Sequence, residues 1–159
     1  MSFRIKTEVT AGITRLGESE GLAYAAGLFD GEGCIHISRQ KKKTARRKFI
    51  YRLVATVAQN HLETLIDFQT LAGVEGRIYR RRRSGTSNRD SFALNYDGKR
   101  AAELLKRLSP LLLRKRDEAE LALHFQKEGK IEKHYGPKGC PQEIWDLREA
   151  CCAKLRKLK

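Results

Sequence analysis

The alternation of hydrophobic and polar positions along the chain predicts β-strands arranged as two hairpins. The four segments with this two-residue period are 34–40, 49–59, 77–83 and 91–96. Polar residues fill the expected turns at 41–47 and 84–88. In one sheet, the strands would direct the following side chains to the same side: Ile35, Ile37, Leu53, Ala55, Ile78, Phe92 and Leu94. We therefore expect this side of the sheet to pack against helices.

Helical spacing of apolar residues fills the gaps between and after the predicted strands. The expected helices are one that ends near Phe29, then 60–71, 101–108, 114–127 and a C-terminal helix opened by Pro141. Asn60 and Asp97 are the candidate N-caps, and Gly73 is the candidate C-terminal stop of the second helix. The resulting order is α, ββ, α, ββ, α, α, α. This order predicts an α+β fold in which helices back one face of an antiparallel sheet and leave its polar face uncovered.

Length and composition indicate one globular domain. The chain has 159 residues, of which 40% are hydrophobic, so its core needs neither disulfides nor a structural metal. We expect a single domain over residues 19–159 after an N-terminal extension over residues 1–18. No apolar run approaches a membrane span, and the first thirty residues contain no signal-peptide core. The expected location is therefore intracellular, in an organelle or a bacterial cytoplasm, without membrane attachment.

The four cysteines show no spacing typical of a zinc site. They are Cys34, Cys140, Cys151 and Cys152. Reduced thiols in an intracellular compartment are the simplest interpretation. Cys151 lies on an apolar helical stripe with Leu147 and Leu155, so we expect it to be a core residue.

The positive charge of the chain, formally +14, is concentrated in two clusters. Between Glu32 and Glu63 there is no acidic residue, and eight Lys and Arg residues fall in that window. A second cluster lies between Arg77 and Arg89. Charge clusters in two corresponding hairpins favour a polyanionic partner, and nucleic acid is the expected one. The alternative is a solvated basic face or a localisation patch.

The predicted polar face of the sheet supplies the candidate nucleic-acid contacts. Long basic side chains at a turn suit backbone phosphates, whereas side chains from strand interiors suit base edges. The candidates are His36, Ser38, Gln40, Lys42, Lys43, Arg46, Arg47, Lys48, Arg52, Thr56, Tyr79, Arg81, Arg83, Ser91 and Asn95.

The segment 24–33 carries the candidate chemistry. It is a helix of small residues that runs into two carboxylates, Asp30 and Glu32, separated by one glycine. A helix C-terminus is partially negative, so this end attracts a divalent cation, and oxygen ligands suit magnesium. Ala23, Ala26 and Gly27 leave one helical face nearly bare, which permits close approach of another backbone. An acidic glycine turn that only ends a helix would also explain the Asp-Gly-Glu-Gly part.

Other ion and nucleotide motifs do not fit these residues. A calcium-binding loop that starts at Asp30 would need glycine at Ile35 and glutamate at Lys41. A dinucleotide-binding loop would need glycine at His36, and the chain contains no phosphate-loop Gly-Lys-Ser/Thr. We therefore expect no nucleotide cofactor.

At Ala25 to Gly33 the sequence resembles the motif of the LAGLIDADG homing endonucleases. Positions Ala26, Gly27, Leu28, Asp30 and Gly33 are identical to the family motif, and Phe29, Gly31 and Glu32 are ordinary replacements. The order of predicted elements extends the resemblance over roughly residues 22–125. Because the motif occurs once, the resemblance implies a homodimer. Its motif helices would cross at the two-fold axis, and each subunit's saddle-shaped sheet would lie in the major groove of double-stranded DNA.

The resemblance also implies roles for individual residues. Glu32 corresponds to the metal-binding carboxylate and Gly31 to the carbonyl ligand. Gln59 corresponds to the side chain that organises water, and Lys115 to the basic residue near the active site. Asp30 has a more structural role and joins Ala23, Ala26 and Gly27 at the implied dimer interface. Some family members have a further basic residue at the position of Glu63, and three residues could substitute for it: Asn60, His61 and Arg114.

Together these observations predict an intron- or intein-encoded, sequence-specific DNA endonuclease. The resemblance implies magnesium as cofactor, with manganese able to substitute and calcium binding without cleavage. Water would attack phosphorus in line, and positive charge near both motif helices would assist the leaving 3′ oxygen. The alternative is a non-catalytic nucleic-acid binder of the same fold, either an RNA maturase or a transcription factor. Glu32 favours the nuclease, because a binder needs no carboxylate facing phosphate.

Overall fold

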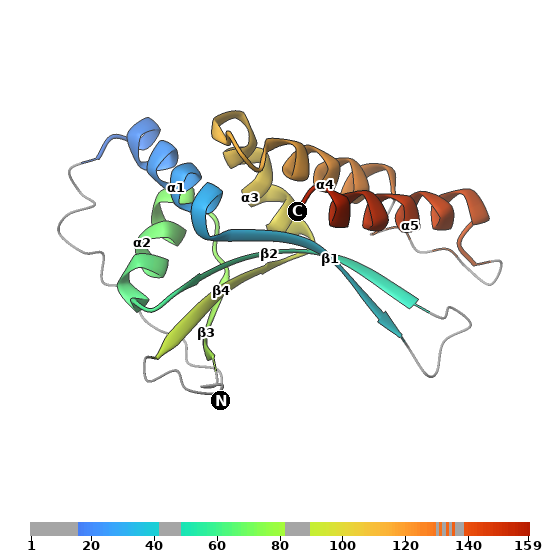
Figure 1. The fold of residues 1–159 in the computed structure, drawn as a ribbon, viewed down its shortest axis with the longest axis horizontal. Coiled ribbons are helices and arrows are strands. Elements are labelled where there is room, and N and C mark those ends of the chain that lie inside the picture. The colour runs from blue at the N-terminus through green and yellow to red at the C-terminus, as the bar shows by residue number, and fades with distance from the viewer. Residues whose placement is uncertain are drawn as a thin grey trace.

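The computed structural model describes residues 16–41, 49–81, 90–129, 131, 133, 135 and 139–159. Over these residues the chain forms five α-helices and one four-stranded antiparallel sheet (Figure 1). In chain order the elements are α1 (Glu18–Glu32), β1 (Gly33–Lys41), β2 (Phe49–Gln59), α2 (Leu62–Ala72), β3 (Arg77–Arg81), β4 (Ser91–Asp97), α3 (Lys99–Leu108), a 3-10 turn (Ser109–Leu111), α4 (Arg116–Glu128) and α5 (Gln142–Lys157). The order of helices and strands predicted from the sequence is thereby confirmed.

The strands lie in the order β1-β2-β4-β3, which joins the two hairpins through their inner strands. The β1–β2 ladder runs from Gly33 opposite Val57 to Lys41 opposite Phe49. β4 pairs only with residues 54–59 of β2. The outer parts of β1 and β2 therefore continue beyond the centre of the sheet as a two-stranded ribbon, which curves away from the helices in Figure 1.

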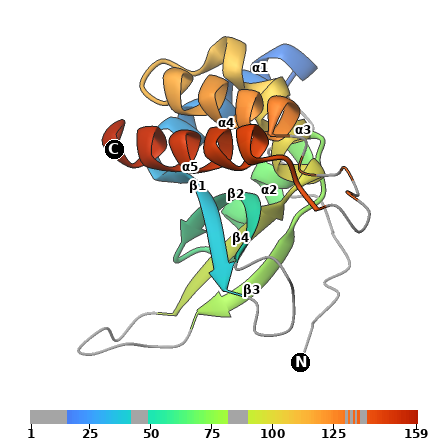
Figure 2. The same cartoon turned by 90° about the vertical axis from the view of Figure 1, so that its right-hand side faces the viewer.

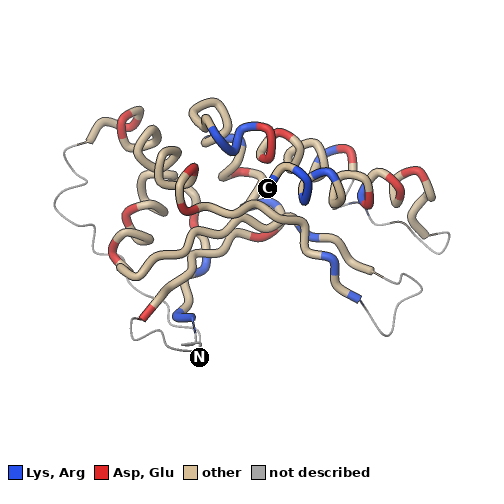
Figure 3. Tube along the Cα trace, viewed as in Figure 1, with Lys and Arg blue, Asp and Glu red and all other residues tan. Residues whose placement is uncertain are grey.

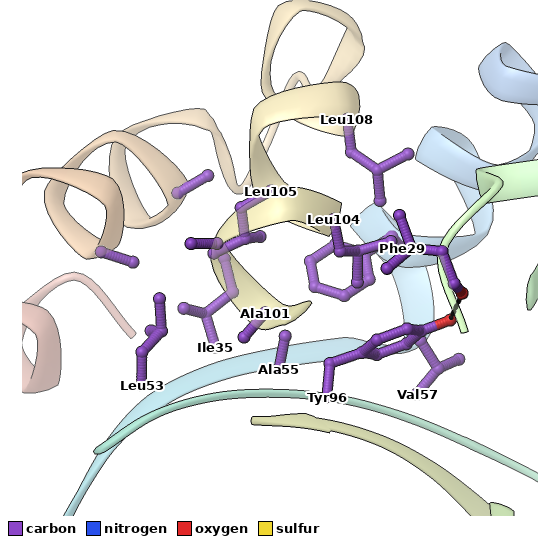
Figure 4. Packing of buried hydrophobic residues seen from close by; sticks show 14 of the residues in the cluster. Phe29, Ile35, Leu53, Ala55, Val57, Tyr96, Ala101, Leu104, Leu105 and Leu108 are labelled. Carbon is purple, nitrogen blue, oxygen red and sulfur yellow. Dashed lines mark hydrogen bonds between the residues drawn. The ribbon is translucent and has the colours of Figure 1, made fainter. Parts of the chain in front are cut away.

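All the helices lie on one face of the sheet, as the two perpendicular views show (Figures 1 and 2). Their apolar side chains form one core with the strand residues that the period-2 pattern directs inward (Figure 4). Ile35, Leu53 and Ala55 from the sheet are fully buried with Leu104 and Leu105 of α3. Ile78 and Phe92, nearer the β3–β4 end, are only partly buried against this core. The opposite face is not covered by any described helix, as predicted.

The predicted N-caps are wrong. α2 begins after His61, not Asn60, and α3 begins after Gly98. Asp97 cannot cap because it is still a strand residue, paired with Val54, and Gly98 makes the turn with a φ of 55° while its N–H donates to the Leu53 carbonyl. The C-terminal stop of α2 is confirmed: Gly73 adopts the left-handed conformation with a φ of 65°.

α4 begins at Arg116, two residues later than predicted. The backbone N–H groups of residues 113–115 are bound by a side chain of α1, Asp30, so the chain makes a separate turn there before the helix. This turn is central to the candidate site.

The C-terminal helix, α5, packs its apolar side against the first hairpin, formed by β1 and β2. Pro141 immediately precedes α5, and the ring of Trp145 meets that of Tyr51 edge-on at 5.3 Å. Cys151 is buried in the common core, which confirms its predicted place. Across the described residues, none of the helices has the length and apolar character needed to span a membrane.

Candidate active site and nucleic-acid interface

The end of α1 presents Glu32 to solvent at the junction with β1. Phe29 anchors this end, because its side chain is fully buried and its carbonyl accepts the N–H of Gly33. A Cβ atom at Gly33 would come within 2.7 Å of the Phe29 ring, so glycine is needed for the direct passage from helix to strand. The last turn of α1 contains no basic residue. Its partial negative charge is therefore uncompensated by the helix itself and is reinforced by Glu32.

Glu32 and Gly31 fit the donor set expected for magnesium. Both are exposed, and a Cβ atom added at Gly31 would meet no atom within 4 Å. Glu32 makes no hydrogen bond or ion pair with any described residue. The described part of the chain contains no cluster of three or more His, Cys, Asp or Glu residues. One chain thus offers one carboxylate and one carbonyl oxygen at this point, which is an incomplete coordination shell for a hard cation.

Asp30 ties the end of α1 to the turn that precedes α4. Its carboxylate accepts backbone N–H bonds from Leu113 at 2.6 Å, Arg114 at 3.2 Å and Lys115 at 3.0 Å. Burial alone would raise the pKa of Asp30, but these three donors and the charge of Lys115 outweigh it and lower the pKa. The structural role predicted for Asp30 therefore has a specific form: its carboxylate holds the turn with residues 113–115 at the end of α1.

Lys115 is buried at the same place, although a lone lysine before a helix is usually a surface residue. Its side chain is only 2% exposed, and its Nζ donates to the carbonyl oxygen of Asp30. Burial, followed by the charge of Arg114, lowers the pKa of Lys115, while Glu118 and Asp30 oppose this effect. The structure therefore places a desolvated ammonium group beside the helix end that carries Glu32.

Arg114 is the basic residue that the structure places beside the end of α1, where the family's further basic residue is missing. Its Nε donates to the Asp30 carbonyl at 3.2 Å. Asn60, His61 and Glu63 are exposed in the connection from β2 into α2, without a described hydrogen bond to the end of α1. Of the three substitutes considered for the missing basic residue, Arg114 is the one fixed beside the carboxylates.

Gln59 lies at the end of β2 that adjoins the helix-to-strand junction. Val57 pairs with Gly33, and Gln59 follows two residues later, on the same side of the strand as Val57. Gln59 is partly exposed and pairs with Phe92 on β4. The ladder thus places Gln59 two residues beyond the strand position that faces Gly33, the residue after Glu32, and no hydrogen bond joins Gln59 to Glu32 among the described residues.

The candidate DNA contacts with described positions lie on the uncovered face, as predicted. The register aligns Ser38 with Arg52, Thr56 with Asn95, and Arg81 with Ser91. Further members of the face are His36, Gln40 and Tyr79, the last of which is 46% exposed. The Thr56 hydroxyl donates to Asn95 Oδ1, which leaves the Asn95 amide N–H groups for another acceptor.

Six predicted contacts lie outside the described residues: Lys42, Lys43, Arg46, Arg47, Lys48 and Arg83. Two residues on the uncovered face were missed by the sequence reasoning. Arg77 pairs with Asn95, and Ile50 is exposed opposite Gln40. Extending the two-residue period by one step in each strand would have found both. Figure 3 shows Lys and Arg toward both outer ends of the sheet.

The outward side of α1 differs from the prediction at one position. Ala23 and Gly27 are exposed, and a side chain at Gly27 would meet no atom within 4 Å. Ala26, however, is 1% exposed and belongs to the core of its own chain, so its predicted place on this bare face is wrong. The exposed face instead includes Tyr24, because helical geometry places positions 20, 24, 27 and 31 along one side.

Comparisons with known proteins agree with this geometry. A sequence model described as LAGLIDADG endonuclease matches residues 25–110, more than half of the chain. A crystal structure of the homing endonuclease I-CvuI in complex with the I-CreI target is similar over 89% of this chain and 83% of that chain, with a TM-score of 0.69 and 24% identity. No curated protein matches the sequence.

Two further solved structures share the fold. The archaeal intron-encoded homing endonuclease I-Vdi141I, complexed with DNA, covers 90% of this chain and 86% of its own, with a TM-score of 0.70 and 15% identity. I-SmaMI, bound to an uncleaved DNA target in the presence of calcium ions, covers 90% of this chain and 46% of its own, with a TM-score of 0.62 and 18% identity. At these identities the similarity establishes the fold.

Proposed function

The chain belongs to the LAGLIDADG endonuclease family, and from that premise we propose that it is a homodimeric, magnesium-dependent DNA endonuclease. It hydrolyses one phosphodiester bond in each strand of a long pseudo-palindromic site. The observation that carries this proposal is Glu32, an exposed carboxylate without a described partner, at the negative end of α1 and directly before the first residue of β1.

Different residues of the chain have different roles in the proposed reaction. Glu32 and the carbonyl of Gly31 would hold the cation, and magnesium bound there would supply Lewis acidity to the phosphate oxygens. Lys115 places positive charge beside the phosphate and the leaving oxygen, where negative charge develops, and its burial strengthens that interaction. Gln59 orients water for in-line attack. Arg114 adds a second positive charge at the same helix end.

A second copy of the chain completes the site. Because each chain offers one carboxylate and one carbonyl at the helix end, two helix ends side by side supply the oxygen ligands that one lacks. The exposed stretch of α1 with Ala23 and Gly27 permits this approach, since small residues let helix axes come close together. The calcium- and magnesium-containing complexes of I-CvuI and I-SmaMI support divalent metal use.

The test is Glu32→Gln, with Glu103→Gln on the exposed side of α3 as the control with the same change of charge. Glu32→Gln removes a metal ligand but no phosphate contact. Cleavage should therefore be abolished while the dissociation constant for DNA stays within about tenfold, or about 1.4 kcal/mol. The control should cut normally. Near-normal cleavage by Glu32→Gln removes Glu32 from the site, and binding without cleavage by the wild type favours the non-catalytic alternative.

A further inference from the structure

The last two turns of the chain carry four basic residues and no acidic one. Lys154, Arg156, Lys157 and Lys159 follow Glu149, the last carboxylate side chain in the sequence. All four side chains are exposed, and none forms an ion pair with a described residue. Positive charge at a helix C-terminus complements the helix dipole, but that effect acts within the last turn and is worth about 0.3–1 kcal/mol per residue. It does not account for four adjacent cations that repel one another.

Three contacts define the direction in which α5 crosses the sheet. Glu149 forms an ion pair of 3.0 Å with Arg39 near the outer end of β1. The Sγ atom of Cys152 lies 3.8 Å from the carbonyl oxygen of Ile37, two residues closer to the start of the strand than Arg39. Lys159 then reaches Cys34, the second residue of β1. The helix therefore runs along the edge strand toward the junction that carries Glu32, and its basic end arrives there (Figures 1 and 3).

At this point the chain reaches the uncovered face of the sheet. Lys159 Nζ lies 3.3 Å from Cys34 Sγ, and Cys34 is aligned across the sheet with Thr56 and Asn95. Burial and then the charge of Lys159 lower the pKa of His36, the next residue on that face, while Asp97 acts in the opposite direction. The basic end of α5 is thus electrostatically part of the face on which DNA would lie.

Resting on the proposed function, we propose that residues 154–159 form a phosphate-binding element that grips the DNA backbone beside the scissile bond. Because the element flanks Glu32 and lies at the edge strand, it contacts the sugar-phosphate chain near the cut and does not read bases. It would neutralise phosphates and release counterions, which makes its contribution independent of sequence and dependent on salt.

The experiment compares two double variants. Lys157→Gln/Lys159→Gln removes two charges of the proposed element, and Lys106→Gln/Lys127→Gln is the control. The control pair removes the same charge from a pocket between α3 and α4 in the helical layer. The first pair should weaken binding to cognate and scrambled duplexes about tenfold at low salt, and flatten the salt slope by about 0.9 for each phosphate that is no longer neutralised. The control pair should match the wild type in both quantities. Thermal denaturation confirms that both variants remain folded.

Phosphate-ethylation interference then gives the position at which the element touches the backbone. Ethylated phosphates within about three base pairs of the cut should impair the wild type but not the Lys157/Lys159 variant, at a spacing of about 3.4 Å per base pair. Equal salt slopes for this variant and the wild type, or an unchanged interference pattern, would overturn the inference and leave the endonuclease assignment standing. A wild type that neither binds nor cuts any duplex would contradict the proposed function itself.

Discussion

The ammonium group of Lys115 is held inside the protein at the end of α1, where it donates to the Asp30 carbonyl. Burying a cation is unfavourable unless it is well paired, and the lowered pKa of Lys115 reflects that cost, with burial as its largest cause. Groups kept in such surroundings are concentrated at functional sites. The position of Lys115 beside the end of α1 that carries Glu32, the proposed metal ligand, therefore supports a part in catalysis.

Lys115→Met should separate stability from activity. Methionine retains most of the volume of the side chain and removes a buried charge, so the free energy of unfolding should change by less than about 1.5 kcal/mol. Cleavage should fall by about 10² to 10³, the usual loss when one stabilising donor is removed from a transition state. Urea denaturation and single-turnover cleavage measure the two quantities. A variant that cuts normally would show that Lys115 only fills space.

Asp30 should give the fold a measurable dependence on acid. Burial by itself would raise its pKa, but the N–H donors of residues 113–115 lower it below its ordinary value of 3.8. Ionised Asp30 therefore contributes stability above about pH 3.8, and the contribution is lost as the pH falls through the folded-state pKa. Asp30→Asn should lower the free energy of unfolding at pH 6 by about 1–3 kcal/mol and by less at pH 3.

Asp117→Asn is the matched control, because Asp117 is an exposed carboxylate in the first turn of α4. Its effect should stay within about 1 kcal/mol, the range of a helix-dipole interaction. Denaturant titrations at pH 6 and pH 3 measure the free energy of unfolding of both variants. Equal losses for Asp30→Asn at pH 6 and pH 3 would mean that the ionised carboxylate is not what holds the turn.

At the scale of elements, α1 serves two surfaces. Ala25, Ala26 and Phe29 are buried in the core of the chain, and Phe29 stacks near Phe68 of α2 at 6.3 Å. On the opposite side Ala23 and Gly27 are exposed, and a Cβ atom added at Gly27 would meet no atom within 4 Å. Because a side chain at Gly27 fits the single chain without contact, its effect on association can be separated from its effect on folding.

Gly27→Leu should therefore convert a dimer into a folded monomer. Leucine at a close helix crossing overpacks the contact by about 1–3 kcal/mol per copy, whereas in the single chain position 27 is exposed and an added Cβ atom meets nothing within 4 Å. Ala150→Leu, at an exposed position of α5, is the control. Light scattering at micromolar concentration should give a dimer for the wild type and the control and a monomer for Gly27→Leu. An active wild-type monomer would contradict the dimer.

The elements were predictable to different degrees. Strand order and facing followed from the two-residue period, because a shift by one residue would expose Leu53 and Ala55 and bury Arg52. The start of α4 could not be predicted from local periodicity, since it depends on Asp30, more than eighty residues away in the sequence. Ala26 was misjudged for the same reason: its burial is decided by tertiary neighbours, not by local spacing. Local spacing likewise gave no sign that Lys115 is buried.

At the scale of the whole molecule, the sheet sets the length of DNA that one subunit can follow. β2 has eleven residues and spans roughly 36 Å at about 3.3 Å per residue, close to ten base pairs at about 3.4 Å each. Two subunits related by a two-fold axis should therefore read a pseudo-palindrome of about twenty base pairs. The curved, uncovered face and the helices behind it suit this arrangement (Figures 1 and 2).

Selection of cleaved molecules from a randomised duplex library, with magnesium or calcium as the divalent ion, tests the central claim most directly. The account predicts cutting in both strands with magnesium and none with calcium. It also predicts that the recovered sites share a two-fold symmetric sequence of about twenty base pairs, as the length of the sheet requires. Absence of cleavage under all metal conditions, together with sequence-specific binding, would contradict it and identify the chain as a non-catalytic DNA-binding protein.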